Sequence, residues 1–537
     1  MAARERRTHS LLAAGLVLLA AGGCRLAPDA GSPSRQDHPN ILIIYTDDVG
    51  YGDVGCYGVG SIDTPRIDAL AATGRRFTQV YSSAATCTPS RYSLLTGHYA
   101  FRNKRARVLN GNAPLLIEPG SLTLPAHLQE AGYHTAVIGK WHLGLGSGEV
   151  DWNGPVTPGP LEIGFDHSYL LPATNDRVPC AYLAGHHIEN LDPSDPITVS
   201  YRENIGARPT GLERPDLLRY AADRQHAGTI INHISRIGWQ AGGKAAEWVD
   251  EEMADRFTER AIDYIEERER LSPDQPWFLY FNLHDVHEPR LPHPRFLGTS
   301  GHGVRGDAML EIDWCVGALV DLLQRLNIRE KTLIVFASDN GPVITDGYGD
   351  GSLAAIGDHT PAGAFRGGKY QAWEGGTRLP FIVSWPGRVT PGVSTAMFSQ
   401  LDLLATVATL VEQPLPADKA ASIDSRDVLP ALLGETDRAR AILLTQSVGR
   451  VSIRWGDWKY IPAGGREGGW AARKHGGEDN PLHSPTMEAD PYLFNLADDP
   501  GEMTNVADKH PEVAEQLRLM LQDLRADPDA VEVLLGK

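Results

Sequence analysis

Oxygen-bearing side chains follow two short apolar segments of the sequence. Asp47 and Asp48 come directly after the segment 41–45, and Asp339 and Asn340 follow the segment 333–336. In open sheets of parallel strands, ligands bind beyond the carboxyl ends of the strands. A lone Asp-Asp pair is more often a solvated turn or a helix cap, but a second such pair at an equivalent strand end favours ligation. Carboxylate and amide oxygens are the ligands that hard cations such as Ca²⁺ and Mg²⁺ prefer. These residues therefore predict a site for one divalent cation.

Basic and imidazole side chains follow apolar segments in the same way. Lys140 and His142 follow the segment 135–138, and His284 and His287 follow the segment 277–281. Lys369 lies farther on, beyond the segment 333–336 and after two glycines. Lys140 and His142 would share one face if their strand continued, which aims a cation and an imidazole at one group. Taken singly, each residue could instead be a packed lysine or a hydrogen-bonded loop histidine. Together they predict an anion-binding site built around the cation.

Cys87 precedes a segment with helix-starting residues, with Thr88 as the expected cap and Pro89 in the first turn. At such a helix N-terminus, the dipole and Arg91 would stabilise negative charge on the sulfur. From the residues alone, Cys87 is either a structural cysteine or a thiolate nucleophile.

The segment 87–97, CTPSRYSLLTG, resembles the signature of the type I, formylglycine-dependent sulfatases, C-x-P-S-R followed by x-x-L-L-T-G. Other segments resemble sulfatase landmarks in the same order along the chain. They are DDVGYGD at 47–53, GKWHLG at 139–144, HEP at 287–289, DNG at 339–341, EGGTRLP at 374–380 and LFNLADDPGE at 493–502. Chance agreement of so many ordered motifs is far smaller than for one motif. The resemblance places the chain in the arylsulfatase-like branch of the alkaline phosphatase superfamily.

This resemblance implies that a formylglycine-generating enzyme oxidises Cys87 to formylglycine (3-oxoalanine), whose hydrated aldehyde is the nucleophile. The residues that it implies as ligands of one Ca²⁺ are Asp47, Asp48, Asp339, Asn340 and the modified Cys87. Arg91 would hold the hydrated aldehyde, and Lys140 and Lys369 would bind sulfate oxygens. His142 would act beside the nucleophile, and His287 would protonate the leaving alcohol.

Contacts to the rest of the substrate are predicted from loops and from a spare histidine. His284 is the weaker candidate for the acid and a candidate substrate contact. The loop 341–368 carries His359 and Arg366, which we expect to line the leaving-group pocket. The segment 178–243 is a second candidate wall, although both segments could be ordinary surface loops.

The predicted activity is hydrolysis of sulfate esters on a sulfated saccharide. One alternative is a phosphoester hydrolase of the same superfamily, which typically uses two metal ions with additional Asp and His ligands. The oxygen-only cation site and the two lysines favour sulfate. A second alternative is an inactive glycan-binding lipoprotein, which the intact residues at every landmark disfavour.

The segments that must position these residues indicate an α/β protein. Four short apolar, β-branched segments alternate with longer helical or irregular stretches, at 41–45, 135–138, 277–281 and 333–336. This pattern predicts a large, mostly parallel sheet flanked by helices, in a catalytic domain over residues 38–435. An expected hairpin over 451–461, a strand over 492–496 and a helix over 511–524 predict a smaller C-terminal α+β domain with an antiparallel sheet, over residues 436–537.

The N-terminus predicts export. Arginines precede the apolar stretch 11–23, so residues 1–23 are expected to be a signal peptide. Small residues before Cys24 resemble a bacterial lipobox, although Ala21 stands where that motif prefers Leu, and simple cleavage with release is the alternative. Residues 24–37 would form a flexible tether. We expect a periplasmic protein or a membrane-anchored lipoprotein of a bacterium.

Composition excludes one class of partner. The 537 residues include 50 Lys and Arg against 68 Asp and Glu, a formal net charge of -18. This acidic balance argues against nonspecific attraction to nucleic acid.

Overall fold

The computed structural model describes residues 38–58, 60–420, 422–464, 474–475, 479–483 and 491–527. The predicted signal peptide 1–23 and tether 24–37 lie outside these residues, so both remain predictions. Among the described residues, no helix is long and apolar enough to cross a membrane.

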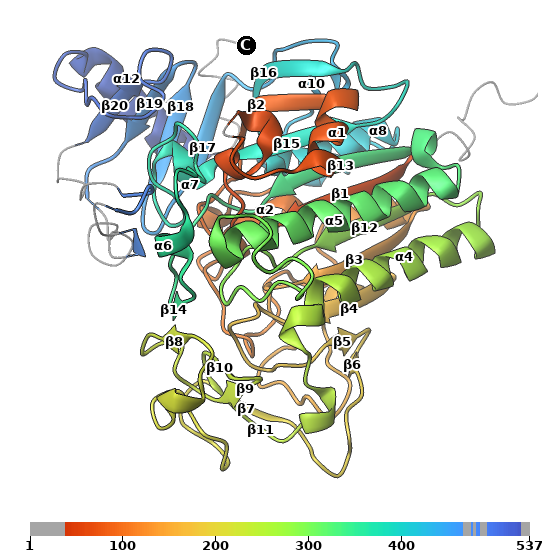
Figure 1. The fold of residues 1–537 in the computed structure, drawn as a ribbon. Helices are drawn as coiled ribbons and strands as arrows, with labels where there is room; N and C mark the ends of the chain where they lie inside the picture. The colour runs from red at the N-terminus through yellow and green to blue at the C-terminus, as the bar shows by residue number, and fades with distance from the viewer. Residues whose placement is uncertain are drawn as a thin grey trace, which may run out of the picture.

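The centre of the molecule is a sheet of ten strands in the order β16-β2-β15-β13-β1-β12-β3-β4-β5-β6 (Figure 1). The four predicted strands are neighbours in its middle and all run parallel. They are β1 (Asn40–Thr46), β3 (His134–Lys140), β12 (Trp277–Asn282) and β13 (Thr332–Ser338). The outer strands are β2 (Arg75–Tyr81), β4 (His167–Leu171), β5 (Leu183–Ala184), β6 (His187–Ile188), β15 (Arg378–Ser384) and β16 (Gly392–Ser399). The prediction of a mostly parallel sheet is confirmed, with β15 antiparallel to both of its neighbours.

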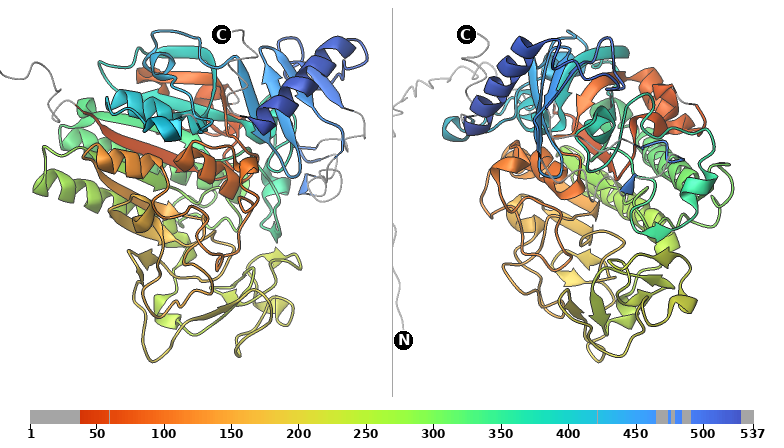
Figure 2. Two further views of the ribbon diagram at one scale, coloured as in Figure 1. Left: turned by 180° about the vertical axis from the view of Figure 1, so that it is seen from behind. Right: turned by 90° about the vertical axis from the view of Figure 1, so that its left-hand side faces the viewer.

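Alternation along β1 shows how the sheet is covered on both faces. Ile41 and Ile43 pack into one apolar core, while Leu42 and Ile44 pack into the other. Figure 1 shows α4 (Met253–Leu271) and α5 (Gly303–Arg325) in front of the sheet, on the same side as α1 (Pro65–Thr73). Figure 2 shows the opposite face, which is covered by α2 (Cys87–Thr96), α3 (Leu124–Glu130), α8 (Leu403–Leu410) and α10 (Leu429–Leu433).

The C-terminal unit contains an antiparallel sheet, as predicted, with a fourth strand, β17 (Ile442–Gln446), that was not predicted. Its strands, in sheet order, are β17, β18 (Val451–Trp455), β19 (Trp458–Ile461) and β20 (Tyr492–Asn495). Leucines of α12 (Pro511–Ala526) pack on this sheet. Lys459 is buried where the unit meets the rest of the molecule, 2.9 Å from Glu374 and 2.8 Å from Glu502. This buried ion-pair cluster joins the two parts.

Short elements complete the fold. The lower lobe in Figure 1 is built from β7 (Thr198–Ser200), β8 (Ala221–Ala222), β9 (Ile230–Ile231), β10 (Ile234–Ser235) and β11 (Trp239–Ala241). Further short elements are β14 (Tyr348–Gly349), α6 (Ser352–Ala355), α7 (Glu374–Thr377), α9 (Ala417–Ala420) and several short 3-10 helices. β14 pairs with β8, which ties the lobe to the loop after β13.

Candidate active site

The polar ends of the parallel strands meet at one edge of the sheet. Parallel pairing sets Thr46 at the end of β1 opposite Ser338 at the end of β13. The residues that follow these two strands and the first residue of α2 therefore come together. Candidate ligand atoms of Asp47, Asp48, Cys87 and Asp339 all lie within 4.8 Å of one another, and all four residues are buried.

These residues fit a hard divalent cation. The Asn340 amide donates to Asp48 at 2.7 Å, while its carbonyl oxygen Oδ1 is buried with no hydrogen-bond partner among the described residues. Burial and the neighbouring Asp339 raise the pKa of Asp47 to about 8. Such crowding of buried carboxylates favours a cation between them, and the unpartnered Asn340 oxygen could supply a further ligand.

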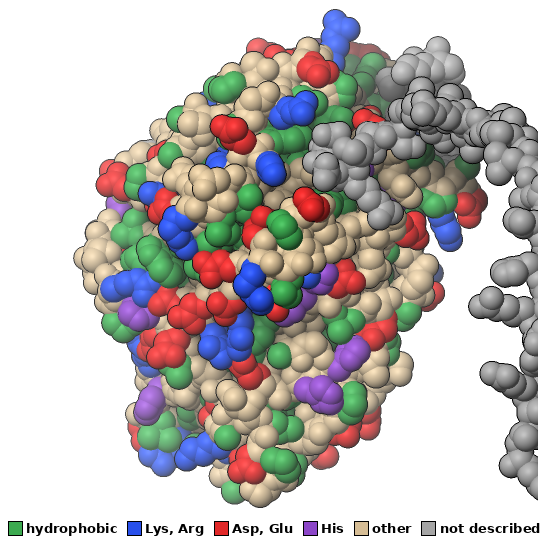
Figure 3. Space-filling view, turned by 90° about the vertical axis from the view of Figure 1, so that its right-hand side faces the viewer, with side chains coloured by type: hydrophobic (Ala, Val, Ile, Leu, Met, Phe, Trp, Pro, Cys, Tyr) green, Lys and Arg blue, Asp and Glu red, His purple; other side chains and the backbone are tan. Residues whose placement is uncertain are grey.

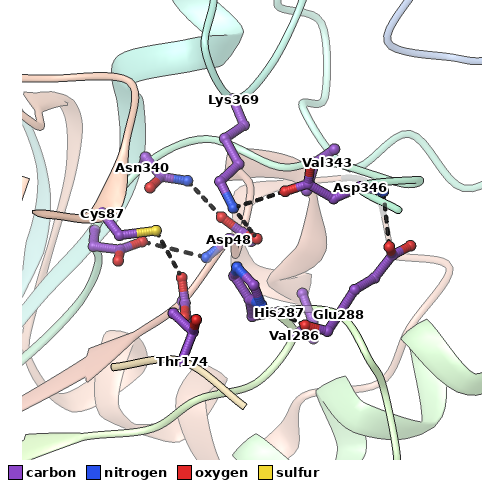
Figure 4. Close-up of polar contacts among 12 residues, drawn as sticks. Asp48, Cys87, Thr174, Val286, His287, Glu288, Asn340, Val343, Asp346 and Lys369 are labelled. Atoms are coloured by element: carbon purple, nitrogen blue, oxygen red, sulfur yellow. Dashed lines mark hydrogen bonds and ion pairs between the residues drawn. The ribbon is translucent and has the colours of Figure 1, made fainter. Parts of the chain in front are cut away.

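Three basic side chains pair with the same carboxylates. Arg91 Nε lies 3.0 Å from Asp339 Oδ2, and Lys140 hydrogen-bonds Asp47. Figure 4 shows Lys369 between two carboxylates, with its Nζ 2.8 Å from Asp48 Oδ2 and 3.2 Å from Asp346 Oδ2. The structure thus brings all of the predicted metal ligands together with the three predicted basic side chains.

Cys87 is the first residue of α2, so the helix begins two residues earlier than the sequence predicted. Thr86 is the cap residue, and the Thr88 hydroxyl donates instead to the carbonyl of His142 at 2.8 Å. The expectation that the helix end favours a thiolate is wrong for the unmodified residue, because burial and Asp47 raise the pKa of the Cys87 thiol well above its usual value. A bare thiolate nucleophile is therefore disfavoured.

A cavity of about 430 Å³ opens above Cys87, and His142, His287 and Lys369 also line it. His142 Nε2 donates to the Leu109 carbonyl at 2.9 Å, and its Nδ1 has no partner among the described residues. His287 Nδ1 donates to the Glu288 carbonyl at 2.6 Å. The other ring nitrogen, Nε2, takes no part in this hydrogen bond. Burial lowers the pKa of both imidazoles well below the usual value, so both rings are neutral in the substrate-free site.

Three predicted substrate contacts do not line this cavity. His359 is buried between Ser61 and Asp53, at 2.6 and 2.8 Å. Arg366 lies over the Trp373 ring, 3.8 Å from its centroid, and donates to the Glu502 carbonyl. His284 is buried beside Asp285, with Nε2 3.6 Å from Oδ1. The structure therefore gives these side chains packing positions outside the cavity. Within the second candidate wall, Gln225 and His226 line the cavity.

Several charged residues line the cavity without having been singled out from the sequence. Asp176 and Arg177 form a buried ion pair at 2.6 Å, and His226 joins them with Nε2 3.5 Å from Asp176 Oδ2. Burial lowers the pKa of His226, but hydrogen bonds to Asp176 and Asp223 outweigh it and raise this pKa to about 9. No signal for the pair was present in the sequence, because β4, which ends at Leu171, was not among the predicted strands, and Asp176 and Arg177 lie in the loop after it.

Comparison with known proteins identifies the family. Residues 39–413 match the sulfatase family. The chain belongs to this family. The family's enzymes hydrolyse sulfate esters, so the predicted reaction class is confirmed. A Bacteroides thetaiotaomicron N-acetylgalactosamine-6-O-sulfatase is 44% identical over 515 residues, covering 95% of this chain and 97% of that protein. Human arylsulfatase A is 33% identical over 514 residues, covering 92% of this chain and 88% of that protein.

Solved structures agree with this assignment. A sulfatase from work on the metabolism of multiple glycosaminoglycans by Bacteroides thetaiotaomicron matches with a TM-score of 0.86 and 44% identity, covering 91% of this chain and all of that one. The phosphonate monoester hydrolase of Agrobacterium radiobacter matches with a TM-score of 0.54 at 18% identity, over 91% of this chain and 96% of that one. At that identity the match shows a shared fold alone.

Proposed function

We propose that this sulfatase removes sulfate from a sulfated saccharide, using a formylglycine made from Cys87 and one Ca²⁺. The observation that carries the proposal is the position of Cys87, which touches the carboxylate cluster on one side and opens into a cavity on the other. A group attached at Cys87 would therefore meet both the cation and the substrate.

The bound groups and the chain would divide the chemistry. When present, the hydrated formylglycine and Ca²⁺ supply an oxygen nucleophile for sulfur and positive charge for the sulfate oxygens. Lys369 lines the cavity and lies beside the cluster, so its Nζ would neutralise a sulfate oxygen as charge develops there. Lys140 lies deeper, against Asp47, and would add positive charge from below.

The two cavity histidines would move protons. Since Nδ1 of His287 is held by the Glu288 carbonyl, Nε2 is the atom that would donate to the leaving sugar oxygen. The negative charge of a bound sulfate ester would offset Lys369 and Lys140 and favour the protonated ring. His142 is held through Nε2, so its buried Nδ1 would accept a proton beside position 87.

Other residues of the cavity would recognise the sugar. Asp176, Arg177 and His226 present buried donors and acceptors to the cavity, which suits the hydroxyl groups of a saccharide. The segment 446–449, which leads from β17 to β18 of the C-terminal unit, lines the cavity as well. Together with the name of the Bacteroides relative, these residues support a 6-O-sulfated N-acetylgalactosamine as substrate.

A specific contact argues against the phosphoester alternative. Asp48, His287 and Asp346 offer ligand atoms within 4.8 Å of one another, which could hold a second metal ion. Lys369 Nζ lies between Asp48 and Asp346, at 2.8 and 3.2 Å, and supplies positive charge there instead. One cation with a lysine suits the singly charged sulfate ester better than a pair of divalent ions.

The test is release of inorganic sulfate from N-acetylgalactosamine 6-sulfate by protein coexpressed with a formylglycine-generating enzyme. We expect release that requires the coexpression, together with an aldehyde on the peptide that contains residue 87, detected by mass spectrometry. Release from a phosphate ester but not from the sulfate ester would support the phosphoester alternative. Failure to release sulfate from a panel of sulfated sugars would support the inactive, glycan-binding one.

We also propose that the protein is exported and anchored to a membrane through Cys24, the expected mature N-terminus. Residues 1–23 have the arginines and the apolar stretch of a signal peptide. Fractionation of cells that express the full chain tests this. We expect the wild type in the membrane fraction and Cys24→Ala as unprocessed precursor or released protein, whereas cytoplasmic wild-type protein would contradict export.

A further inference from the structure

A second, larger cavity adjoins the active-site cavity. We call it the outer groove; it is lined by residues from the segments 104–116, 148–153 and 197–205. Its volume is about 1490 Å³, compared with about 430 Å³ for the active-site cavity. Since pockets for drug-sized ligands are roughly 300–1,000 Å³, the outer groove has room for more than one sugar unit.

The two cavities adjoin along one segment of the chain. Residues 107–110 line both cavities, so Arg107 and Asn110 belong to the boundary between them. A sugar chain whose sulfated unit fills the active-site cavity would pass this segment and place its neighbouring unit in the outer groove.

The outer groove has a local excess of basic side chains in an acidic protein. Its basic residues are Lys104, Arg105, Arg107 and Arg202, and its acidic residues are Glu149, Asp151 and Glu203. By contrast, the whole chain has 68 acidic and 50 basic residues. Figure 3 shows one face of the described protein, on which acidic and basic side chains are interspersed. The excess in the groove therefore differs from the charge of the chain as a whole.

Most of the basic side chains in the groove are available to a ligand. Lys104, Arg107 and Arg202 are exposed and form no ion pair among the described residues, whereas Arg105 donates to the Leu115 carbonyl at 2.7 Å. Of the acidic residues, Asp151 accepts hydrogen bonds from the backbone and side chain of Asn153. Glu149 and Glu203 are also exposed and form no ion pair among the described residues, so three unpaired basic side chains face two unpaired acidic ones, and Arg107 lines the active-site cavity as well.

We infer that the outer groove binds a second, anionic sugar unit of the substrate, with Lys104 and Arg202 contacting its carboxylate or sulfate. This inference rests on the proposed function for the identity of the first unit. The shared segment 107–110 places the two cavities side by side, and the excess of basic side chains supplies the attraction. An acidic neighbouring sugar is thus a determinant of specificity beyond the sulfated sugar itself.

A binding experiment tests the outer groove without requiring turnover. The probes are an unsulfated tetrasaccharide of alternating uronic acid and N-acetylgalactosamine, its carboxyl-reduced analogue, and a sulfated version of that neutral analogue. By calorimetry at low salt, we expect the wild type to bind either anionic probe about fivefold to tenfold more tightly than the neutral one. The double variant Lys104→Gln/Arg202→Gln should lose this advantage. The two anionic probes separate carboxylate from sulfate recognition. The control variant is Lys331→Gln. Lys331 is exposed and precedes the first residue of β13, so it lies at the end of the strands opposite to the active site. This variant should retain the advantage of the anionic probes.

Kinetics separate this inference from the proposed function. The double variant should release sulfate from the monosaccharide at the wild-type rate and lose the advantage of an acidic neighbouring sugar. Equal binding of the neutral and anionic probes by the wild type would overturn the inference, whatever the activity. Absence of sulfate release from every substrate would overturn the proposed function, and the binding experiment would still decide on the groove.

Discussion

Replacement of Lys369 tests the electrostatics of the site most directly. The lysine side chain is only 2% exposed, and its Nζ contacts Asp48 and Asp346 at 2.8 and 3.2 Å. Lys369→Gln keeps a polar side chain of similar length but removes the charge. It therefore tests whether that charge stabilises the reacting sulfate or only holds the two carboxylates.

Two effects of different kind are expected from this change, one on kcat and one on stability. Removing one preorganised stabilising donor from an active site lowers kcat by roughly 10²–10³, or about 2.7–4 kcal/mol. Breaking a buried ion pair also lowers the free energy of unfolding, by roughly 3–5 kcal/mol when the partner charge is left unpaired. Because a bound Ca²⁺ would neutralise Asp48, the loss of stability should be smaller in excess Ca²⁺ than in chelator.

The assay is steady-state sulfate release with Ca²⁺ present, together with Tm measured in Ca²⁺ and in chelator. Lys474→Gln is the matched control, because Lys474 contacts the other oxygen of Asp346 at 3.2 Å without contacting Asp48. We expect this control to raise KM more than it lowers kcat. A Lys369→Gln enzyme with the kcat of the wild type would refute the role assigned to Lys369, even if its Tm fell.

Three further predictions concern the cation, a buried histidine and a supporting ion pair. Chelation should abolish sulfate release and lower Tm, and added Ca²⁺ should restore both; activity that survives exhaustive chelation would contradict the cation site. The raised pKa of His226, about 9, means that its contribution to stability is complete below pH ~6.5 and is lost as pH rises through 9, up to about 3 kcal/mol. Denaturant unfolding from pH 6 to 10 should show this decline, and His226→Gln should flatten it; equal slopes would contradict the assignment. Asp53→Asn should lower the free energy of unfolding by roughly 3–5 kcal/mol, because buried Asp53 pairs with Arg305 at 2.6 Å. The exposed change Glu515→Gln should leave Tm unchanged, and equal Tm values for the two variants would count against the ion pair.

The central fold could be predicted because its strands are buried on both faces. The β1 sequence Ile41-Leu42-Ile43-Ile44-Tyr45 is apolar throughout, and a continuous apolar segment of this length is typical of a parallel strand covered by helices. The strand β2, Arg75–Tyr81, was missed because it carries two arginines and is only partly buried. Its position depends on pairing with β15 and β16, which no local pattern reveals.

The reactive part of the site could be predicted for a related reason. Asp47, Lys140 and Asp339 each stand at or just after the end of a recognisable strand, so parallel pairing was enough to bring them together. Their places in a known family's motifs added the roles. The structure shows these side chains in contact, whereas the Ca²⁺ ion and the formylglycine remain proposals.

The substrate contacts could not be predicted, because they depend on the paths of loops. His359 lies in a polar loop that suggested a pocket wall, yet it turns inward and donates to Asp53. Conversely, Asp176 and His226 are distant in the sequence and meet only through the path of the lower lobe. Loop paths of this kind depend on tertiary packing rather than on local residue preferences.

The central claim is that the group made from Cys87 performs the chemistry, and its most direct test is sulfate release by Cys87→Ser over many turnovers. A serine supplies one hydroxyl, whereas a hydrated formylglycine at position 87 would supply two, and the second would allow sulfate to be expelled with return of the aldehyde. We expect Cys87→Ser to stop at a covalent sulfate adduct, seen by mass spectrometry, or to release no sulfate. Continuous turnover by this variant at the rate of the wild type would contradict the account.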